Sequence, residues 1–407
     1  MYLHEVTVKN YSIHKETKIA LSPISVLVGP NGGGKSALFD ALLNFSMLAR
    51  GRLSEAFGAY PYSFTATRHR SASKISRIGY DVLMSTCPES PDKVRYRIDY
   101  SQVDKGGEVV PPRFEIYRET LELDGKILFD RENPDATALK AALKHLVGDV
   151  GILSAVRRAE VEDNAGRFPP VVVALAKEIS RLNKFRLEPY TLRMVSALPD
   201  LTAPDAPRIA YSGENVAGTL YYLEKTGAPA LTAITDGLKR ALPDFDGFEF
   251  NSVGPQRIGF SMRFADARQT ITAPRLSDGQ LLVVGLMVLL YGPARPPVLM
   301  IEEPENGLTA PVQREVYRAV RALAFGTPPD RSQVLISSHS PFVLCDAWNG
   351  DDREFVHQVK VEDGHAVVRK FSDAIAAQGI QLAKDADGKR THLGLRNAEE
   401  LMAGYLV

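Results

Sequence analysis

Cysteine is scarce in this chain: among 407 residues there are only two, Cys87 and Cys345, and they lie far apart. Their positions lack the spacing of a metal-ligand motif, and one distant pair does not make a disulfide framework. The scarcity of cysteine therefore fits a reducing compartment, and we expect a cytoplasmic protein.

The sequence also has no excess of charge of one sign, because 49 lysine and arginine residues balance 49 aspartate and glutamate residues. A chain with zero net charge is not drawn as a whole onto nucleic acid. Residues 157–193 carry eight basic and five acidic side chains, which is typical of a solvated helical surface. A possible DNA contact must therefore be local or be supplied by a partner.

Long hydrophobic runs are absent as well. The longest strongly apolar run extends from Leu281 to Tyr291 and is interrupted only by Gly285. A membrane-spanning helix needs about 20 apolar residues, so this run predicts a buried helix instead. The N-terminus lacks the basic-then-apolar profile of a signal peptide. We expect a soluble protein with no membrane contact.

What the sequence does contain is a phosphate-binding loop at residues 29–36, which reads Gly-Pro-Asn-Gly-Gly-Gly-Lys-Ser. It follows a predicted strand at 24–28 and precedes a predicted helix at 37–43, a context that disfavours an ordinary glycine-rich turn. Lys35 is expected to contact the β- and γ-phosphates, and the Ser36 hydroxyl to ligate Mg²⁺. The residues predicted to bind a nucleoside triphosphate are Asn31, Gly32, Gly33, Gly34, Lys35, Ser36 and Ala37.

A second motif follows a predicted buried strand at residues 298–301. Glu302, Glu303 and Pro304 come directly after its four apolar residues, and α/β sheets place ligands at the carboxyl ends of their strands. We expect Glu302 to orient the Mg²⁺ shell through water, and Glu303 to polarise the attacking water as general base. The alternative is an acidic surface pair after a strand, which is common when such a pair stands alone.

Three shorter motifs complete the set. Ser277, Gly279 and Gln280 lie at the start of the apolar helix, where a hydroxyl and exposed N–H groups can face an anion; alone, these residues also match an ordinary turn and N-cap. His339 follows an apolar strand and is interpreted as a γ-phosphate sensor, although a lone histidine is usually structural. Residues 305–308 predict a tight turn that reaches a second nucleotide site.

Taken in order, these five elements resemble those of the ABC-type ATPases, specifically the branch that contains RecF, the SMC-type heads and the OLD-family ATPases. The opening residues 6–11, Val-Thr-Val-Lys-Asn-Tyr, resemble that branch's first strand. Residues 301–308 and 333–341 resemble the OLD-like patterns Glu-Glu-Pro-Glu-Asn and Thr-His-Ser-Pro. The resemblance covers residues 1–43 and 247–345 and is weaker over the residues between them.

This resemblance implies how the heads act. In such proteins two heads enclose two ATP molecules, and the signature serine of one head completes the phosphate site of the other. Ser277 and Gly279 would then act in trans on the nucleotide held by Lys35 and Ser36, in a homodimer or higher oligomer that uses ATP and Mg²⁺. The implied setting is bacterial antiphage defence or DNA repair, with a separate effector such as a nuclease, as in Septu-like defence ATPases.

Two other functions are weighed against this one. The first is a slowly hydrolysing, ATP-gated scaffold that holds an effector inactive, which sustained phosphate release would exclude. The second is the ATPase of a membrane transporter, which the opening strand and the Glu-Glu-Pro-Glu-Asn sequence disfavour.

Several positions depart from the branch's pattern. Gly33 replaces the usual serine, a conservative change for a backbone cradle, while Gly307, Thr309 and Ala310 replace the usual His, His and Pro. No glutamine is assigned to the link between the γ-phosphate and the insertion, because Gln102 lies in a predicted hairpin.

Two charged segments are interpreted as loops. The first is the solvated basic loop Arg68-His69-Arg70. The second contains Asp385 and Asp387, which superficially resemble the Asp-x-Asp of the Toprim domain in OLD-family nucleases. Only 66 residues follow Pro341 (407 minus 341), so we expect no complete Toprim domain and no DNA cleavage by this chain alone.

The predicted fold class is α/β: an ABC-type P-loop head with an antiparallel β-subdomain and a helical insertion. Alternation predicts strands at 3–8, 17–21, 95–100, 113–117, 247–253 and 257–264, and helical periodicity predicts helices at 171–182, 216–223 and 230–242. Residues 1–135 are assigned to the N-terminal part of the core with its β-subdomain, 136–245 to the insertion, and 246–407 to the C-terminal part with the signature, the acidic strand and His339.

Overall fold

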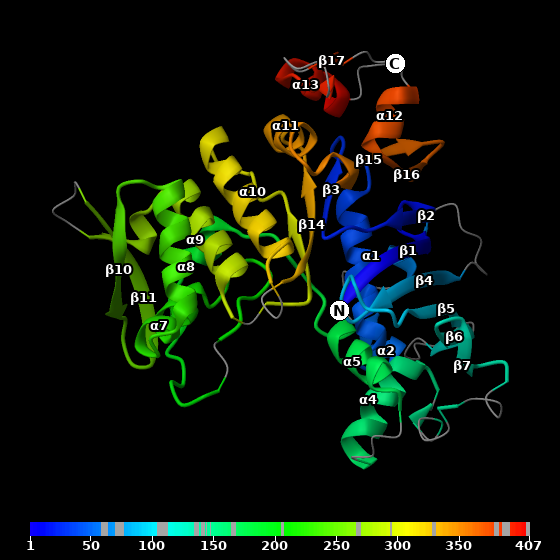
Figure 1. Ribbon diagram of the computed structural model, residues 1–407. Coiled ribbons are helices and arrows are strands. Elements are labelled where there is room, and N and C mark those ends of the chain that lie inside the picture. Colours follow the sequence, from blue (N-terminus) through cyan, green and yellow to red (C-terminus); the bar gives the residue numbers. More distant parts are fainter. Residues whose placement is uncertain are drawn as a thin grey trace. The chain divides into compact units, whose positions relative to one another are not determined.

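Figure 1 shows the computed structural model of the protein, which forms two compact units. The structure describes residues 1–57, 64–69, 77–103, 113–133, 138–139, 143, 145–146, 148–163, 168–204, 207–265, 270–293, 295–327, 331–377, 382–384 and 391–403. The first unit comprises Met1–Pro23, Gly29–Asn183 and His357–Ile375, and the second comprises Ile24–Val28, Lys184–Val356 and Ala376–Val407. The sequential division into 1–135, 136–245 and 246–407 stays a prediction.

An antiparallel sheet is the framework of the first unit. Its strand order is β2–β1–β4–β5–β6–β7, with the bounds His14–Ala20, Tyr2–Tyr11, Ile78–Ser85, Val94–Val103, Arg113–Leu123 and Lys126–Asp130. Alternate residues of β5 are buried, as expected for a strand with one face on a core. The strands predicted in this part of the chain are confirmed, and Gln102 lies in the β5–β6 hairpin, as predicted.

Helix α1 (Lys35–Leu48) anchors its C-terminal half on this sheet. The side-chain oxygen of Asn44 accepts hydrogen bonds from the hydroxyl groups of Tyr80 (3.0 Å) and Tyr100 (2.7 Å). The Phe45 ring packs against the Tyr80 ring, with 5.5 Å between centroids. Because the buried amide oxygen is satisfied and the rings are in contact, the sheet positions the helix that begins at the phosphate loop.

The other elements of the first unit include a hairpin and several helices. They are α2 (Leu53–Ala56), α3 (Phe64–Thr67), α4 (Ile152–Asp163), α5 (Pro170–Ile179), β15 (Val356–Glu362), β16 (His365–Lys370) and α12 (Phe371–Ala377). The helix predicted at 171–182 is confirmed as α5. The prediction of a solvated basic loop is wrong for His69, which is buried and whose N–H donates to the Asn10 carbonyl; Arg70 lies outside the described residues.

Three parallel strands form the centre of the second unit. They pair in the order β3 (Ile24–Val28), β14 (Gln333–Ser338), β13 (Val298–Glu302), and all their residues are buried. Such continuously buried strands are typical of a parallel sheet covered on both faces. The register places Glu302 opposite Ser337, and Ser338 opposite Val28, so the carboxyl ends of the three strands meet at one edge.

The predicted apolar helix is α9 (Asp278–Tyr291), which packs against both α8 (Pro229–Ala241) and α10 (Ala310–Ala324) (Figure 1). Residues 281–290 of α9 are all buried, which confirms the prediction of a buried helix. Within the described ranges, no helix combines the length and the apolar character that crossing a membrane requires.

The second unit contains further strands and helices, and they confirm the predicted α/β class. The strands are β8 (Asn183–Phe185), β9 (Ser196–Ala197), β10 (Phe245–Ser252), β11 (Arg257–Phe264), β12 (Ile271–Thr272), β17 (Ala383–Lys384) and β18 (Thr391–His392). The helices are α6 (Pro189–Leu192), α7 (Val216–Lys225), η3 (Ala273–Arg275), α11 (Pro341–Asn349), η4 (Arg353–Phe355) and α13 (Leu395–Ala403). Asp385 and Asp387 lie outside the described residues.

Candidate functional site

The phosphate loop follows β3, and its lysine is held over the loop's own backbone. The Lys35 ammonium donates to the carbonyl oxygens of Gly29 (2.7 Å) and Pro30 (3.0 Å), and the residue is only 5% exposed. Helix α1 begins at this lysine, so its N-terminal N–H groups and positive dipole end face the same loop. A buried cation beside a helix N-terminus is a site for an anion such as a phosphate.

The loop is packed closely against β15. A Cβ atom added at Gly33 would lie 2.8 Å from the Val359 carbonyl oxygen and 3.0 Å from the Pro30 carbonyl oxygen. Both neighbours are backbone atoms, which cannot move aside like the end of a flexible side chain. Gly33, where the resembling branch has serine, is therefore required here by close packing.

The remaining predicted loop residues are placed so that a nucleotide could reach them. Asn31, Gly32 and Ser36 are exposed, whereas Gly33 and Lys35 are buried. The loop thus offers a buried ammonium, exposed backbone and an exposed hydroxyl, which fit a triphosphate and one oxygen ligand of Mg²⁺.

In the second unit, Glu302 ends β13 as a buried carboxylate, with the residue 4% exposed. Its Oε2 lies 3.5 Å from the Lys184 ammonium and accepts a hydrogen bond from the Tyr211 hydroxyl at 3.3 Å. Its Oε1 is buried and has no hydrogen-bond partner among the residues that the structure describes. An unsatisfied carboxylate oxygen is the hard ligand that Mg²⁺ prefers, so Glu302 fits its predicted metal role.

Glu303 has a backbone conformation that few residues adopt. Its φ of 46° lies in the left-handed region, which is costly for a side chain other than glycine and is found at functional sites. Its N–H donates to the Ser337 carbonyl at 2.9 Å. The carboxylate accepts hydrogen bonds from the Asn306 amide (2.9 Å) and the Arg186 guanidinium (3.4 Å).

His339 is brought to the same carboxylates. Its Nδ1 lies 3.5 Å from Glu303 Oε1 and 3.4 Å from Glu305 Oε1. Glu305 is buried. Its Oε1 accepts hydrogen bonds from the Ser338 hydroxyl and from the backbone N–H of His339, each at 2.8 Å. Burial raises the pKa of the Glu305 carboxyl above its ordinary range. Glu305 therefore braces the turn that carries His339.

The signature residues form a capping box at the start of α9. The Gln280 N–H donates to the Ser277 hydroxyl (3.3 Å), and the Ser277 N–H donates to the Gln280 side-chain oxygen (2.9 Å). Arg193 donates to the Leu276 carbonyl (3.3 Å) and to the Asp278 carboxylate. The helix start, including Gly279, is thus held in one conformation with Ser277 at the surface.

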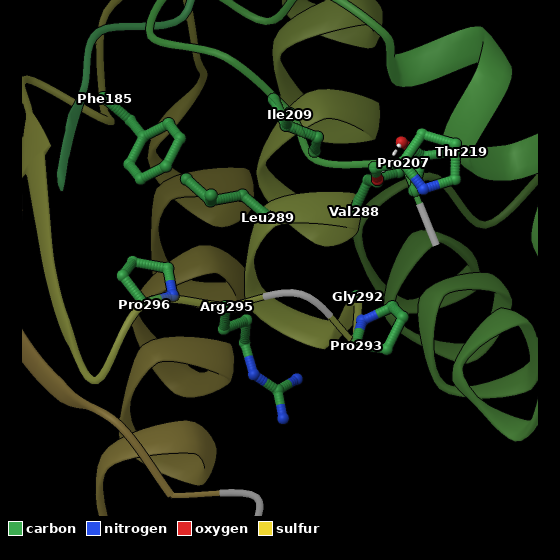
Figure 2. A pocket seen from close by; sticks show the side chains of 10 residues that line it. All are labelled: Phe185, Pro207, Ile209, Thr219, Val288, Leu289, Gly292, Pro293, Arg295 and Pro296. Carbon is green, nitrogen blue, oxygen red and sulfur yellow. Dashed lines mark hydrogen bonds between the residues drawn. The ribbon is translucent and has the colours of Figure 1, made fainter. Parts of the chain in front are cut away.

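The second unit has a pocket of about 440 Å³ beside the end of β13. Its walls include Arg186, Tyr211, Asp278, Glu302, Glu303, Asn306 and Gly307. A second, smaller pocket of the same unit is lined mainly by apolar side chains, among them Phe185 and Leu289 (Figure 2). There, Thr219 and Arg295 hydrogen-bond to backbone carbonyls.

The sequence motifs gave no indication of four residues at this site. Lys184, Arg186, Arg193 and Tyr211 come from the segment between α5 and α7, more than 80 residues before their partners. The only available signal was the basic pair Lys184 and Arg186, two residues apart. That pair does not predict which acidic residues the two side chains contact.

Comparison with known proteins identifies a family whose model matches most of this chain. Residues 24–346 match a family model described as "AAA domain, putative AbiEii toxin, Type IV TA system". The chain is similar to the SMC head domain from Thermotoga maritima, with 13% identity over 91% of this chain and 99% of that chain, and a TM-score of 0.44. It is also similar to an SMC head bound to the C-terminal winged-helix domain of ScpA, with 14% identity over 92% and 100% of the chains, and a TM-score of 0.48. No curated protein matches the sequence.

Proposed function

This chain belongs to the AAA-domain family that its residues 24–346 match, and from that membership we propose that it binds ATP with Mg²⁺ and hydrolyses it. The observation that carries the proposal is the placement of Glu303, a strained residue whose carboxylate is held by hydrogen bonds at the end of a buried strand. Such a carboxylate suits a general base that activates water.

Each predicted residue has a place in this reaction. Lys35 would hold the phosphate oxygens, and Ser36 would offer a hydroxyl ligand to the metal. In the second unit, Glu302 would orient the metal's water shell. When bound, Mg²⁺ supplies positive charge that offsets the charge of the phosphates. Glu303 takes the proton of the attacking water. His339, 3.5 Å from Glu303, responds to the γ-phosphate.

The second part of the proposal is that two heads assemble around ATP and control a separate effector. Ser277 is exposed at a helix start that two reciprocal hydrogen bonds with Gln280 hold, with Gly279 between them. This arrangement suits completion of a phosphate site in another head. The family's description includes the words "putative AbiEii toxin, Type IV TA system", and this supports a setting in which the chain works with a second protein. We propose antiphage defence or DNA repair as that setting.

A slowly hydrolysing scaffold is the competing function, and one contact favours it. Arg186 donates to Glu303 Oε2, and this hydrogen bond competes with a water molecule for the proposed base. A scaffold would bind ATP and assemble without sustained phosphate release, so turnover decides between the two functions.

The first test compares Glu303→Gln with Lys35→Ala. Glu303→Gln should keep ATP binding and lower phosphate release about 10²–10⁴-fold, the usual effect of losing a general base. Lys35→Ala should weaken binding itself, because it removes the buried cation. Titration with a fluorescent ATP analogue and a phosphate-release assay measure both quantities. The control is Glu249→Gln, which changes an exposed ion pair of β10 and should alter neither quantity. Hydrolysis by Glu303→Gln at the wild-type rate would refute the assignment of Glu303 as general base.

The second test asks whether two heads share a site. Ser277→Arg should leave ATP affinity intact and abolish turnover. Mixing it with equal Lys35→Ala should restore about a quarter of wild-type activity, because half of the dimers are mixed and each has one intact site. Mixing Ser277→Arg/Lys35→Ala with Lys35→Ala should restore none. Equal results from the two mixtures would contradict completion in trans.

A further inference from the structure

His14 of β2 is fully buried beside the phosphate loop, and both of its ring nitrogens have partners within the first unit. Nε2 lies 2.9 Å from the carbonyl oxygen of Gly34, and Nδ1 lies 2.9 Å from the hydroxyl of Thr17. Thr17 is also buried, and its hydroxyl lies 3.3 Å from the carbonyl oxygen of Ala366 in β16. The imidazole therefore connects β2 to the last glycine of the loop.

The surroundings leave this ring little freedom. The Ala366 N–H donates to the Ile13 carbonyl at 2.9 Å, which joins β16 to the residue before the histidine. A Cβ atom added at Gly34 would lie 2.8 Å from the Ala366 Cβ and 3.0 Å from the Ile13 Cγ2. Gly34, His14 and Ala366 thus form one tightly packed group behind the loop.

The proton arrangement follows from the chemistry of the partners. A carbonyl oxygen only accepts, so Nε2 must carry the hydrogen that it donates to Gly34. The Thr17 hydroxyl has one hydrogen and two acceptors within reach, the Ala366 carbonyl at 3.3 Å and Nδ1 at 2.9 Å. Beside a neutral ring protonated on Nε2, it donates to the nearer Nδ1. Burial, reinforced by the nearby His69, lowers the pKa of His14, although the Gly34 hydrogen bond opposes this shift. The neutral ring with hydrogen on Nε2 is therefore the form that fits.

Gly34 accepts two hydrogen bonds through its carbonyl oxygen. It is the N-cap of α1 with a φ of 108°, and as glycine it has no side chain with which to cap the helix. Its carbonyl accepts the hydrogen bond of the Leu38 N–H at 3.0 Å as well as that of His14. Because a trans peptide is planar, a carbonyl held on one side directs the N–H of Lys35 to the opposite side.

We infer that His14 is a positioning residue for the nucleotide: its Nε2–H holds the Gly34 carbonyl so that the Lys35 amide is directed at the phosphate. The inference rests on the proposed function, since it assigns His14 to the same loop. His14 itself contacts no phosphate in this role. Nucleotide affinity should therefore depend on whether residue 14 has a hydrogen-bond donor at the position of Nε2.

Two amide substitutions separate this role from mere packing. The amide nitrogen of glutamine can reach the position of Nε2, whereas that of asparagine reaches only the position of Nδ1. His14→Gln should therefore bind a fluorescent ATP analogue within about threefold of wild type. His14→Asn should bind it about tenfold or more weakly, as expected for a lost hydrogen bond to a part-buried carbonyl. Both variants should lower the melting temperature, since both replace a buried ring.

Thr17 provides a test that leaves the ring in place. Thr17→Val removes the hydroxyl that fixes the tautomer and should weaken nucleotide binding. Thr17→Ser keeps the hydroxyl and should bind nucleotide like the wild type. Equal affinities for His14→Gln and His14→Asn, or for Thr17→Val and Thr17→Ser, would overturn the inference. Lys35→Ala is measured alongside: if it too bound ATP normally, the proposed function would fail rather than the role of His14 alone.

Discussion

The phosphate loop of the first unit and the acidic end of β13 in the second unit are held by different kinds of contact. Around the loop, the contacts are to the backbone: Lys35 donates to two carbonyls, His14 to a third, and Gly33 packs against the Val359 carbonyl. Around β13, charged side chains contact both carboxylates: Lys184 lies near Glu302 and Arg186 near Glu303, in addition to the hydrogen bonds from Tyr211 and Asn306.

This difference shows why the phosphate loop could be recognised from the sequence, whereas the residues around the end of β13 were only partly predicted. The hydrogen bonds of Lys35 lie within eight consecutive residues, whose glycines and lysine stand at a fixed spacing, and spacing is visible in a sequence. An ion pair requires only that two opposite charges meet in space. The loop should therefore be sensitive to added volume, whereas the acidic end should be sensitive to lost charge.

The largest expected effect is the loss of the buried charge at Lys184. Lys184→Met leaves Glu302 buried without its cation and should lower the free energy of unfolding by about 3–5 kcal/mol. Adding Glu302→Gln should recover most of this loss, because no unpaired charge remains. Urea unfolding followed by circular dichroism measures both. The control is Lys360→Met, which breaks a more exposed pair with Glu362 and should cost under about 1 kcal/mol. Equal losses for Lys184→Met and Lys360→Met would show that burial does not matter here.

A smaller effect is expected from added volume at the loop. Gly33→Ser introduces the residue usual in the resembling branch, but its Cβ would meet the carbonyls of Val359 and Pro30. Overpacking of this kind costs about 1–3 kcal/mol, and it should also weaken nucleotide binding because the loop must shift. Gly394→Ser, at a position with open space around it, should change neither quantity. A Gly33→Ser protein as stable as wild type would show that the backbone of β15 shifts to accommodate the added side chain at little cost in free energy.

Much of the site could be predicted because its motifs are local. The strand before the loop, the helix after it, the buried helix α9 and the end of β13 are all formed where their patterns placed them. The capping box of Ser277 and Gln280 likewise needs only residues three apart. The basic loop at Arg68–Arg70 shows the limit: the burial of His69 depends on a distant partner, the carbonyl of Asn10.

The sequence by itself determined the phosphate loop, the buried strands and the acidic pair, because each depends on the order and the polarity of neighbouring residues. Only the tertiary structure decided that Lys184 and Tyr211 meet Glu302, that Arg193 braces the signature, and that His14 holds Gly34. These contacts join residues 20 to 118 positions apart. At such separations the packing of strands and helices selects the partners, and any side chain of suitable charge can serve, so no spacing in the sequence records the choice.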